Sequence, residues 1–113
     1  MTGNKAITIQ KKSIIKNEIN EDVEEWLSVC TLDGFLDMMS GDSRMTYNTK
    51  IEESSHVFIC DFQPLPDDIK PENTRVIDGK GKIYEVMLYH NVMELDEQWE
   101  IYLKDIGGQN NVS

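Results

Sequence analysis

The sequence predicts a mainly β fold, a small antiparallel β-barrel or sandwich of five to seven strands, with a long loop and at most one short helix. Apolar and polar residues alternate over short runs, as they do in half-buried strands. Turn-forming residues separate these runs, and the 39% of hydrophobic residues in a chain of 113 supply one modest core. We expect a single barrel-like domain over residues 1–106 and a disordered tail over 107–113, which lacks core residues.

The first two expected strands cover residues 6–15 and 23–32 and form a hairpin across the polar segment 16–22. Residues 35–39 fit either a short helical turn or an extension of the second strand, and the pattern does not decide between them. A third strand over 56–62 is apolar on both faces, which is typical of a strand with neighbours on both sides.

The second half of the chain carries a break and then three more strands. Pro64 and Pro66 follow the third strand and end its pairing, because proline has no N–H to donate. A hairpin over 75–77 and 82–89 comes next, with glycines in the turn between its arms, and a last strand covers 98–103. Tyr84, Val86 and Leu88 are expected to point inward, and Trp99, Ile101 and Leu103 share one face of the last strand.

The charge of the chain restricts its partners. With 21 acidic and 11 basic residues, the net charge of −10 argues against wrapping nucleic acid or binding an anionic membrane surface, and suits protein partners. The first 17 residues carry four lysines and no acid, which leaves −14 for the remainder. This basic start either faces away from the acidic body or is simply solvated. No apolar run of 18 residues is present, so we expect no membrane span.

Residues that could carry chemistry are few. Cys30, His56, Cys60 and His90 could bind a metal or support a thiol nucleophile only if the fold gathered them, and packing is the simpler interpretation. A Cys30–Cys60 disulfide requires adjacent strands, and two cysteines in a chain of this size favour an intracellular protein with reduced thiols. We therefore predict no catalytic, cofactor-binding or metal-binding residues, and no enzyme activity.

A long polar segment, 40–55, interrupts the pattern of strands. It contains few large apolar side chains and is long for a connection in a small domain, and such loops are usually functional or mobile. Met38, Met39 and Met45 flank it, and they suit a subunit contact as well as they suit the core.

The order of segments resembles a known family. Residues 54–62, with His56-Val57 at their centre, are similar to the "E-S-T-H-V" strand of phage head–tail joining proteins, also called head closure or stopper proteins. Residues 69–76 match the family's "gI…p..rV" segment, 78–88 its "dG..Yei" hairpin arm, and 95–103 its last "lEiyl" strand.

That resemblance implies a small β-barrel that forms a ring beneath the portal after DNA packaging, closes the head and provides the platform for the tail. The implied partners are other connector proteins: a portal or adaptor ring and tail proteins. The chain would be a monomer alone and a ring in the virion, made in the host cytoplasm, with DNA only as channel contents. Loop 40–54 would face the channel or a partner. Its candidate residues are Ser40, Gly41, Asp42, Arg44, Met45, Tyr47 and Lys50.

An alternative follows from the charge alone. A small acidic β domain can act as a nucleic-acid mimic that inhibits a DNA-binding protein. A mimic needs a regular stripe of carboxylates, whereas the acidic residues here are scattered along the chain, so we rank this hypothesis second.

Overall fold

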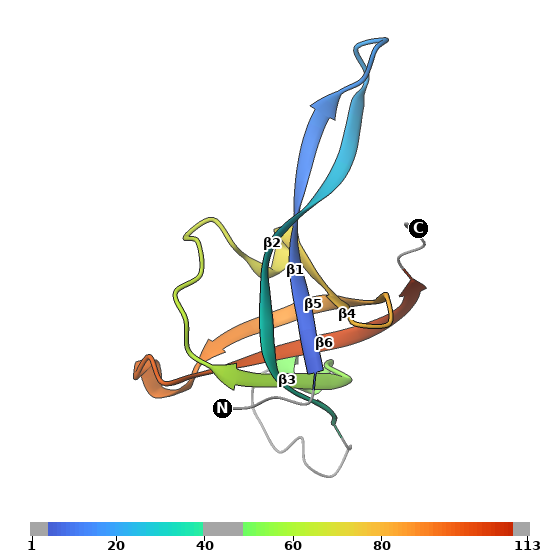
Figure 1. The fold of residues 1–113 in the computed structure, drawn as a ribbon. Coiled ribbons are helices and arrows are strands. Elements are labelled where there is room, and N and C mark those ends of the chain that lie inside the picture. Colours follow the sequence, from blue (N-terminus) through green and yellow to red (C-terminus); the bar gives the residue numbers. More distant parts are fainter. Residues whose placement is uncertain (1–4, 40–48, 110–113) are drawn as a thin grey trace.

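The computed structural model describes residues 5–39 and 49–109 as a closed antiparallel barrel with strand order β1-β2-β3-β6-β5-β4 (Figure 1). The mainly β fold that the sequence predicted is confirmed, with six strands in one sheet. The strands are β1 (Lys5–Lys16), β2 (Asp22–Met38), β3 (His56–Asp61), β4 (Thr74–Asp78), β5 (Lys82–Asn91) and β6 (Gln98–Gln109). Short helical segments are α1 (Thr49–Glu52), η2 (Pro71–Asn73) and η3 (Val92–Glu94).

The hairpin of β1 and β2 is longer than the barrel that it helps to form. β1 pairs with β4 only from Ile7 to Lys11, and β2 pairs with β3 only from Phe35 to Met38. Residues 12–16 and 22–26 pair only with each other in the described part of the chain. Together with Leu27, which pairs with Lys11 at the base, they project as a two-stranded ribbon (Figure 1). We call this ribbon, with its turn, the arm. The same pairing shows that residues 35–38 extend the second strand rather than form a helical turn.

The core fills the barrel interior with residues from every strand. It consists of Ile7, Ile9, Leu32, Phe58, Cys60, Val76, Tyr84, Val86, Ile101 and Leu103. Trp99 packs against this cluster. Leu88 was expected to face inward with Tyr84 and Val86, and this is wrong. The pairing of β5 with β6 shifts register between Val86 and Leu88, and Tyr89 packs on the core instead.

Gly34 is where β2 crosses close to β3. A Cβ atom at this position would lie 2.2 Å from the Ile59 carbonyl oxygen and 2.8 Å from the Cys60 Cβ. A glycine inside a strand commonly marks such a close approach of two backbones. The missing side chain therefore lets β2 bend onto β3 and close the sheet.

The predicted hairpin of the second half is present as β4 and β5. The Asp78 carboxylate accepts the backbone N–H groups of Lys80 and Lys82, each at 2.9 Å, and Gly81 has a φ of 84°. The turn thus depends on a side-chain acceptor and on one glycine in the left-handed region.

The last strand reaches further than the sequence indicated. β6 runs to Gln109, which pairs with Lys82, so residues 107–109 belong to the sheet although a tail was expected from 107 onward. The remaining residues of that tail, 110–113, lie outside the described part of the chain.

The connections divide between the two ends of the barrel. The arm, the segment 62–73 and the connection 92–97 leave the strands at one end, because neighbouring strands run in alternate directions. By the same alternation, the end of β2, α1 and the turn of residues 79–81 belong to the other end. The two ends therefore offer two separate surfaces.

Candidate docking surfaces

The arm exposes large apolar side chains. Ile14 and Ile19 are 64% and 73% exposed, and Ile15, Val23 and Leu27 are between 39% and 50% exposed. An isolated two-stranded hairpin is marginally stable in water, because it has no second layer to bury its apolar face. Exposed apolar residues concentrated on a projecting ribbon are typical of a surface that a partner covers.

Three of these residues share one face of the arm. Ile15 lies directly opposite Val23 in the ladder, and Leu27 lies opposite Lys11. Side chains alternate along β1, so the face that points into the core at Ile9 continues outward to Ile15. The inner face of the barrel wall thus extends past the barrel, where the described residues place no further strand over it.

The opposite face of the arm is fixed to the barrel. The Arg75 guanidinium lies 4.4 Å from the centroid of the Trp26 ring, and its Nε donates to the Gln10 side-chain oxygen at 2.8 Å. Lys12 and Lys16 on the same strand pair form ion pairs with Glu24 and Asp22. The cation–π contact of Arg75 with Trp26 thus joins this face of the arm to β4.

The turn of the arm is locally ordered. The Asn17 side-chain oxygen accepts the backbone N–H groups of Ile19 at 3.1 Å and Glu21 at 2.9 Å, and Asn20 has a φ of 64°. Asparagine suits both tasks, because its short amide bonds to nearby backbone and it tolerates the left-handed region. Ile19 is therefore held outward at the tip.

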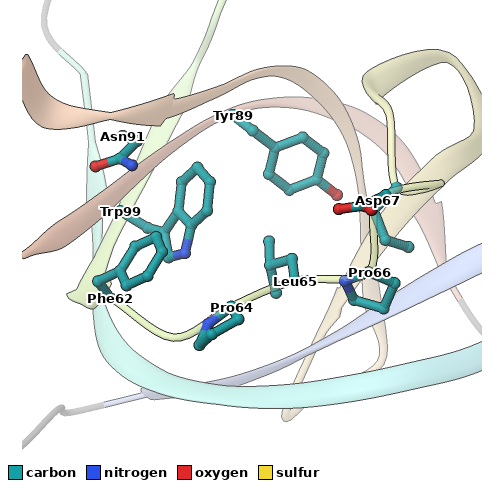
Figure 2. Close-up of a pocket in the computed structure, with 9 residues that line it drawn as sticks. Phe62, Pro64, Leu65, Pro66, Asp67, Tyr89, Asn91 and Trp99 are labelled. Atoms are coloured by element: carbon teal, nitrogen blue, oxygen red, sulfur yellow. The ribbon is translucent and has the colours of Figure 1, made fainter. Parts of the chain in front are cut away.

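A cleft of about 360 Å³ opens between the segment after β3 and strands β5 and β6 (Figure 2). The Trp99 indole N–H donates to the Gln63 carbonyl at 2.9 Å, and the Phe62 ring stacks on Trp99 with centroids 5.3 Å apart. Leu65 faces Trp99 and Tyr89 across the cleft. The lining residues are Phe62, Pro64, Leu65, Pro66, Asp67, Ile69, Tyr89, Asn91 and Trp99.

Tyr89 forms a rigid wall of this cleft. Its hydroxyl lies 2.8 Å from the Thr74 hydroxyl, which donates to the Lys70 carbonyl at 2.7 Å. Burial raises the pKa of Tyr89 to about 12, so the ring stays neutral at physiological pH. This contact attaches the segment before β4 to the barrel.

The connection from β5 to β6 borders the cleft with an unusual backbone. Met93, Glu94 and Asp96 all have φ values of 54° or 55°, a region that side chains other than glycine and asparagine seldom occupy. The Asn91 amide donates to the Asp96 carboxylate at 2.6 Å and accepts the Asp96 N–H at 3.1 Å. Strained backbone that surrounding bonds hold in place is enriched at functional sites.

The cleft is rimmed by acidic residues. Residues 61–70 and 91–97 contain six acids and one base, a net charge of −5 out of −10 for the chain. The arm residues 12–27 add five acids and two bases, a further −3. Of the two interpretations of the basic start, the structure does not show the one in which it faces away from the acidic body, because Lys11, Lys12 and Lys16 pair with Asp68, Glu24 and Asp22.

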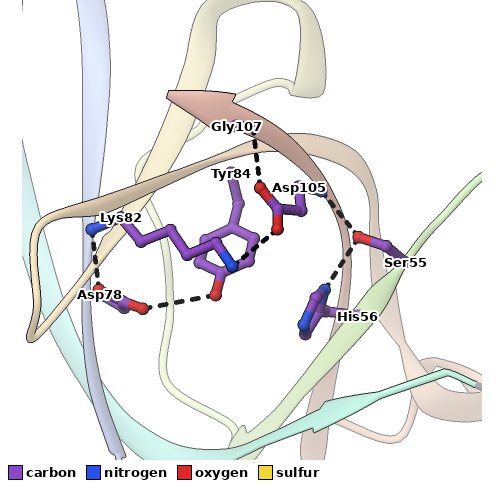
Figure 3. A network of polar contacts seen from close by, with 7 residues as sticks. All are labelled: Ser55, His56, Asp78, Lys82, Tyr84, Asp105 and Gly107. Carbon is purple, nitrogen blue, oxygen red and sulfur yellow. Dashed lines mark hydrogen bonds and ion pairs between the residues drawn. The ribbon is translucent and has the colours of Figure 1, made fainter. Parts of the chain in front are cut away.

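The opposite end carries a polar network (Figure 3). Lys82 Nζ lies 2.7 Å from the Asp105 carboxylate, and the Asp105 N–H donates to the Ser55 hydroxyl at 2.7 Å. The Ser55 hydroxyl also lies 2.9 Å from His56 Nδ1, and the His56 ring meets Tyr84 edge-on. The network connects β3, β5 and β6 where α1 joins the barrel.

The charges of this network change the pKa values of its members. The bond from Lys82, and then the N–H of Gly107, lower the pKa of the Asp105 carboxyl. The Asp105 bond raises the pKa of Lys82, and burial lowers the pKa of His56. The polar groups of the network bond to one another, so the geometry indicates that the network has a structural role.

Most of the loop residues singled out from the sequence lie outside the described part of the chain. They are Ser40, Gly41, Asp42, Arg44, Met45 and Tyr47. Lys50 has its backbone in α1, and its side chain is outside the described atoms. Ser54, the last residue of that loop, is fully buried and so belongs to the barrel.

The arm and the cleft were not recognised as sites from the sequence. Ile14 and Ile15 are adjacent in sequence, so one of them must face away from the core, and this was the signal in the sequence that could have revealed the arm.

Cys30 and Cys60 are both free thiols. Among residues 5–39 and 49–109, no three His, Cys, Asp or Glu side chains are grouped to hold a metal, and no helix is long and apolar enough to cross a membrane.

Residues 2–104 match the family model of the phage head completion protein. The chain belongs to this family. The family resemblance seen in the sequence is thereby confirmed, and the protein is a structural component of phage head completion that interacts with other head and tail proteins of the virion.

A solved structure shares the fold. The solution structure of protein SF1141 from Shigella flexneri 2a aligns with a TM-score of 0.72 over 96% of each chain, at 15% sequence identity. At this identity the likeness concerns the fold alone. The search of curated proteins found no match.

Proposed function

We propose that this protein closes the phage head as one layer of the head–tail connector and provides the platform on which the tail attaches. Family membership supports the head-closure role, and the arm supports the assembly role. Its apolar face, with Ile15, Val23 and Leu27, continues the barrel interior and is left exposed in the single chain. A neighbouring subunit in an assembled ring would cover that face.

The charge favours a ring that forms only on its partner. A net charge of −10 on 113 residues opposes self-association of free subunits through mutual repulsion. A portal or adaptor ring would supply the template that holds subunits close enough for the arms to pack. The two separate ends of the barrel suit a subunit placed between two layers.

Loop 40–54 is proposed to face the channel or a partner at the end opposite the arm. The support is the family resemblance, together with the positions of Met39 and α1, where the chain enters and leaves this loop. Because Ser54 is buried, the proposed role concerns residues before it, and a deletion should spare the barrel by replacing 41–47 with a Gly-Ser linker. Unchanged DNA retention in heads carrying that deletion would refute this part.

The nucleic-acid mimic is less well supported. The acidic residues of the arm and the cleft rim alternate with exposed Ile19, Met93 and Leu95, whereas a mimic of DNA needs carboxylates at regular spacing. Binding of the chain to a DNA-binding protein in place of DNA, without any binding to connector rings, would reverse this ranking.

Size analysis of the purified chain, alone and mixed with portal or adaptor rings of the same phage, tests the proposal. We expect a monomer that moves into the ring fraction on mixing. A folded monomer that joins no connector ring would contradict the connector role.

A further inference from the structure

We propose that the cleft beside Trp99 binds an extended, basic segment of another protein of the phage head, with an apolar side chain as its anchor. This inference rests on the proposed function, because that function supplies the class of partner. It is carried by two independent properties of the cleft: its apolar lining and its acidic rim.

The lining fits an apolar anchor. The stacked Phe62 and Trp99 rings form one wall and Leu65 faces them from the other, while the Trp99–Gln63 bond fixes their separation (Figure 2). A volume of about 360 Å³ is at the lower end of the range of about 300–1,000 Å³ of ligand pockets. It therefore suits side chains of a peptide segment, and a preformed aromatic wall adds little ordering cost on binding.

The rim selects a basic partner. Asp67 lines the cleft, and Glu94 lines an adjoining hollow that shares Tyr89, Asn91 and Trp99 with it. Glu97 is next to the cleft because its backbone carbonyl accepts the Phe62 N–H at 3.1 Å. All three side chains are exposed, in segments that carry a net charge of −5. Lysine or arginine flanking the anchor would lie close to these carboxylates, which accelerates association and excludes acidic competitors. The same charge excludes nucleic acid.

The rim also argues against a second copy of this chain as the occupant. Another copy exposes large apolar side chains on its arm, whose residues 12–27 carry a net charge of −3. It exposes others at Phe35, Met38, Met93, Leu95 and Ile106, on a chain whose net charge is −10. Inserting that arm into a rim of −5 brings like charges together, which costs free energy rather than gaining it. The complementary occupant is a basic segment of a different protein.

A defined peptide can test both properties. The probe is an acetylated heptapeptide of alternating lysine and leucine, titrated into ¹⁵N-labelled protein while the indole N–H signal of Trp99 is followed. Two matched peptides replace every lysine by glutamate or every leucine by serine. We expect binding of the lysine–leucine peptide, and binding about tenfold weaker or weaker for either control.

Each other result contradicts a stated part of the cleft proposal. Equal binding of the glutamate peptide removes the charge argument, and equal binding of the serine peptide removes the anchor. If the lysine–leucine peptide leaves the Trp99 signal unshifted, the cleft is not a peptide site. A concentration-dependent shift of the protein without peptide would assign the cleft to a second copy instead.

Reversing charges at the rim tests whether the charge dependence of peptide binding comes from the cleft. The variant Asp67→Lys, Glu94→Lys, Glu97→Lys raises the net charge from −10 to −4, and so does the control Asp33→Lys, Asp37→Lys, Glu85→Lys, whose residues are exposed and do not line the cleft. We expect the rim variant to lose about tenfold in affinity for the lysine–leucine peptide, and the control to lose far less. Equal losses would reduce the effect to net charge and overturn the site.

Binding to DNA-filled heads made without this protein distinguishes failure of the proposed function from failure of the cleft proposal. Wild-type chain that does not co-sediment with such heads contradicts the proposed function. If the wild type co-sediments and the rim variant does so equally well, the function stands and the cleft proposal fails. Co-sedimentation of the wild type and of the control variant, but not of the rim variant, is the result we expect.

Discussion

The Trp99 indole N–H donates to the Gln63 carbonyl at 2.9 Å, across thirty-six positions of sequence. This bond attaches the proline-containing segment after β3 to the start of β6 and holds the cleft open between them. The shape of the cleft therefore depends on this directional contact, together with the stacking of Phe62 on Trp99 and the bond from the Phe62 N–H to the Glu97 carbonyl at 3.1 Å.

Replacing Trp99 by phenylalanine should loosen that segment. The variant keeps an aromatic ring for stacking but loses the hydrogen bond, which should lower the free energy of unfolding by about 1 kcal/mol. Urea unfolding measures this change, and hydrogen exchange of residues 63–69 should quicken. The control Trp26→Phe, on the arm, should leave that segment unaltered. Unchanged exchange after Trp99→Phe would show that the bond does not order the segment.

A substitution at Gly34 tests how the barrel closes between β2 and β3. Gly34→Ala places a Cβ 2.2 Å from the Ile59 carbonyl, a backbone atom that cannot move without breaking the β2–β3 ladder. We expect a loss of about 3 kcal/mol in the free energy of unfolding. Gly79→Ala is the matched control, because no heavy atom lies within 4 Å of the added Cβ. Similar stabilities of the two variants would contradict this account of closure.

Local patterns of residues were sufficient to predict most strands. Alternation over a few positions defines a strand, and each expected strand is present. Four of them end within two residues of their predicted bounds, whereas β2 and β6 each run six residues further. The closure of the barrel was beyond such reasoning, because the pairing of Ile7–Lys11 with β4 joins segments about 65 residues apart. The bulge near Leu88 could not be predicted from alternation either. One unpaired residue in a strand moves every later side chain to the opposite face of the sheet.

The candidate site was harder to predict than the fold. Loop 40–54 was selected because it lacks large apolar residues, and this criterion cannot find a surface built from apolar residues. Val23 and Leu27 alternate like core residues, and they become exposed only because β4 is too short to cover the arm. Trp99 was placed on one face of its strand with Ile101 and Leu103; it packs against the core and also lines the cleft.

The inner face of the arm should matter for assembly and little for folding. Ile15→Ser with Val23→Ser removes apolar groups that are already 44% and 39% exposed, so the free energy of unfolding should change by less than about 1 kcal/mol. Recruitment to connector rings should fall strongly. Ile14→Ser, on the other face of the same strand, is the control and should be recruited normally. Loss of recruitment in the control alone would assign the contact to the outer face.

The two thiols should differ in reactivity. Burial first, and then the charge of Asp61, raise the pKa of Cys60 to about 11, and its side chain is 2% exposed. Burial also raises the pKa of Cys30, which is only half-buried. A thiol reagent at pH 8 should modify Cys30 in the native protein and Cys60 only after unfolding in urea. Cys30→Ser should leave native protein unreactive, and rapid modification of that variant would contradict the burial of Cys60.

The Lys82–Asp105 pair should make stability depend on pH at both extremes. The pKa of Asp105 is lowered from 3.8, so its contribution is present above 3.8 and is lost as the pH falls through the lower folded value. The pKa of Lys82 is raised from 10.5, so its contribution is present below 10.5 and is lost as the pH rises through the higher folded value.

Urea midpoints at pH 7 and pH 3 test the acid side of that dependence. Asp105→Asn cannot ionise, so it should be less stable than the wild type at pH 7, and the difference should shrink at pH 3. Asp33→Asn, exposed on β2, serves as the control and should follow the wild-type pH dependence. Because both side chains of the Lys82–Asp105 pair are partly exposed, at 43% and 28%, added salt should also reduce the difference at pH 7. An Asp105→Asn variant with the same acid loss as the wild type would show that other carboxylates dominate.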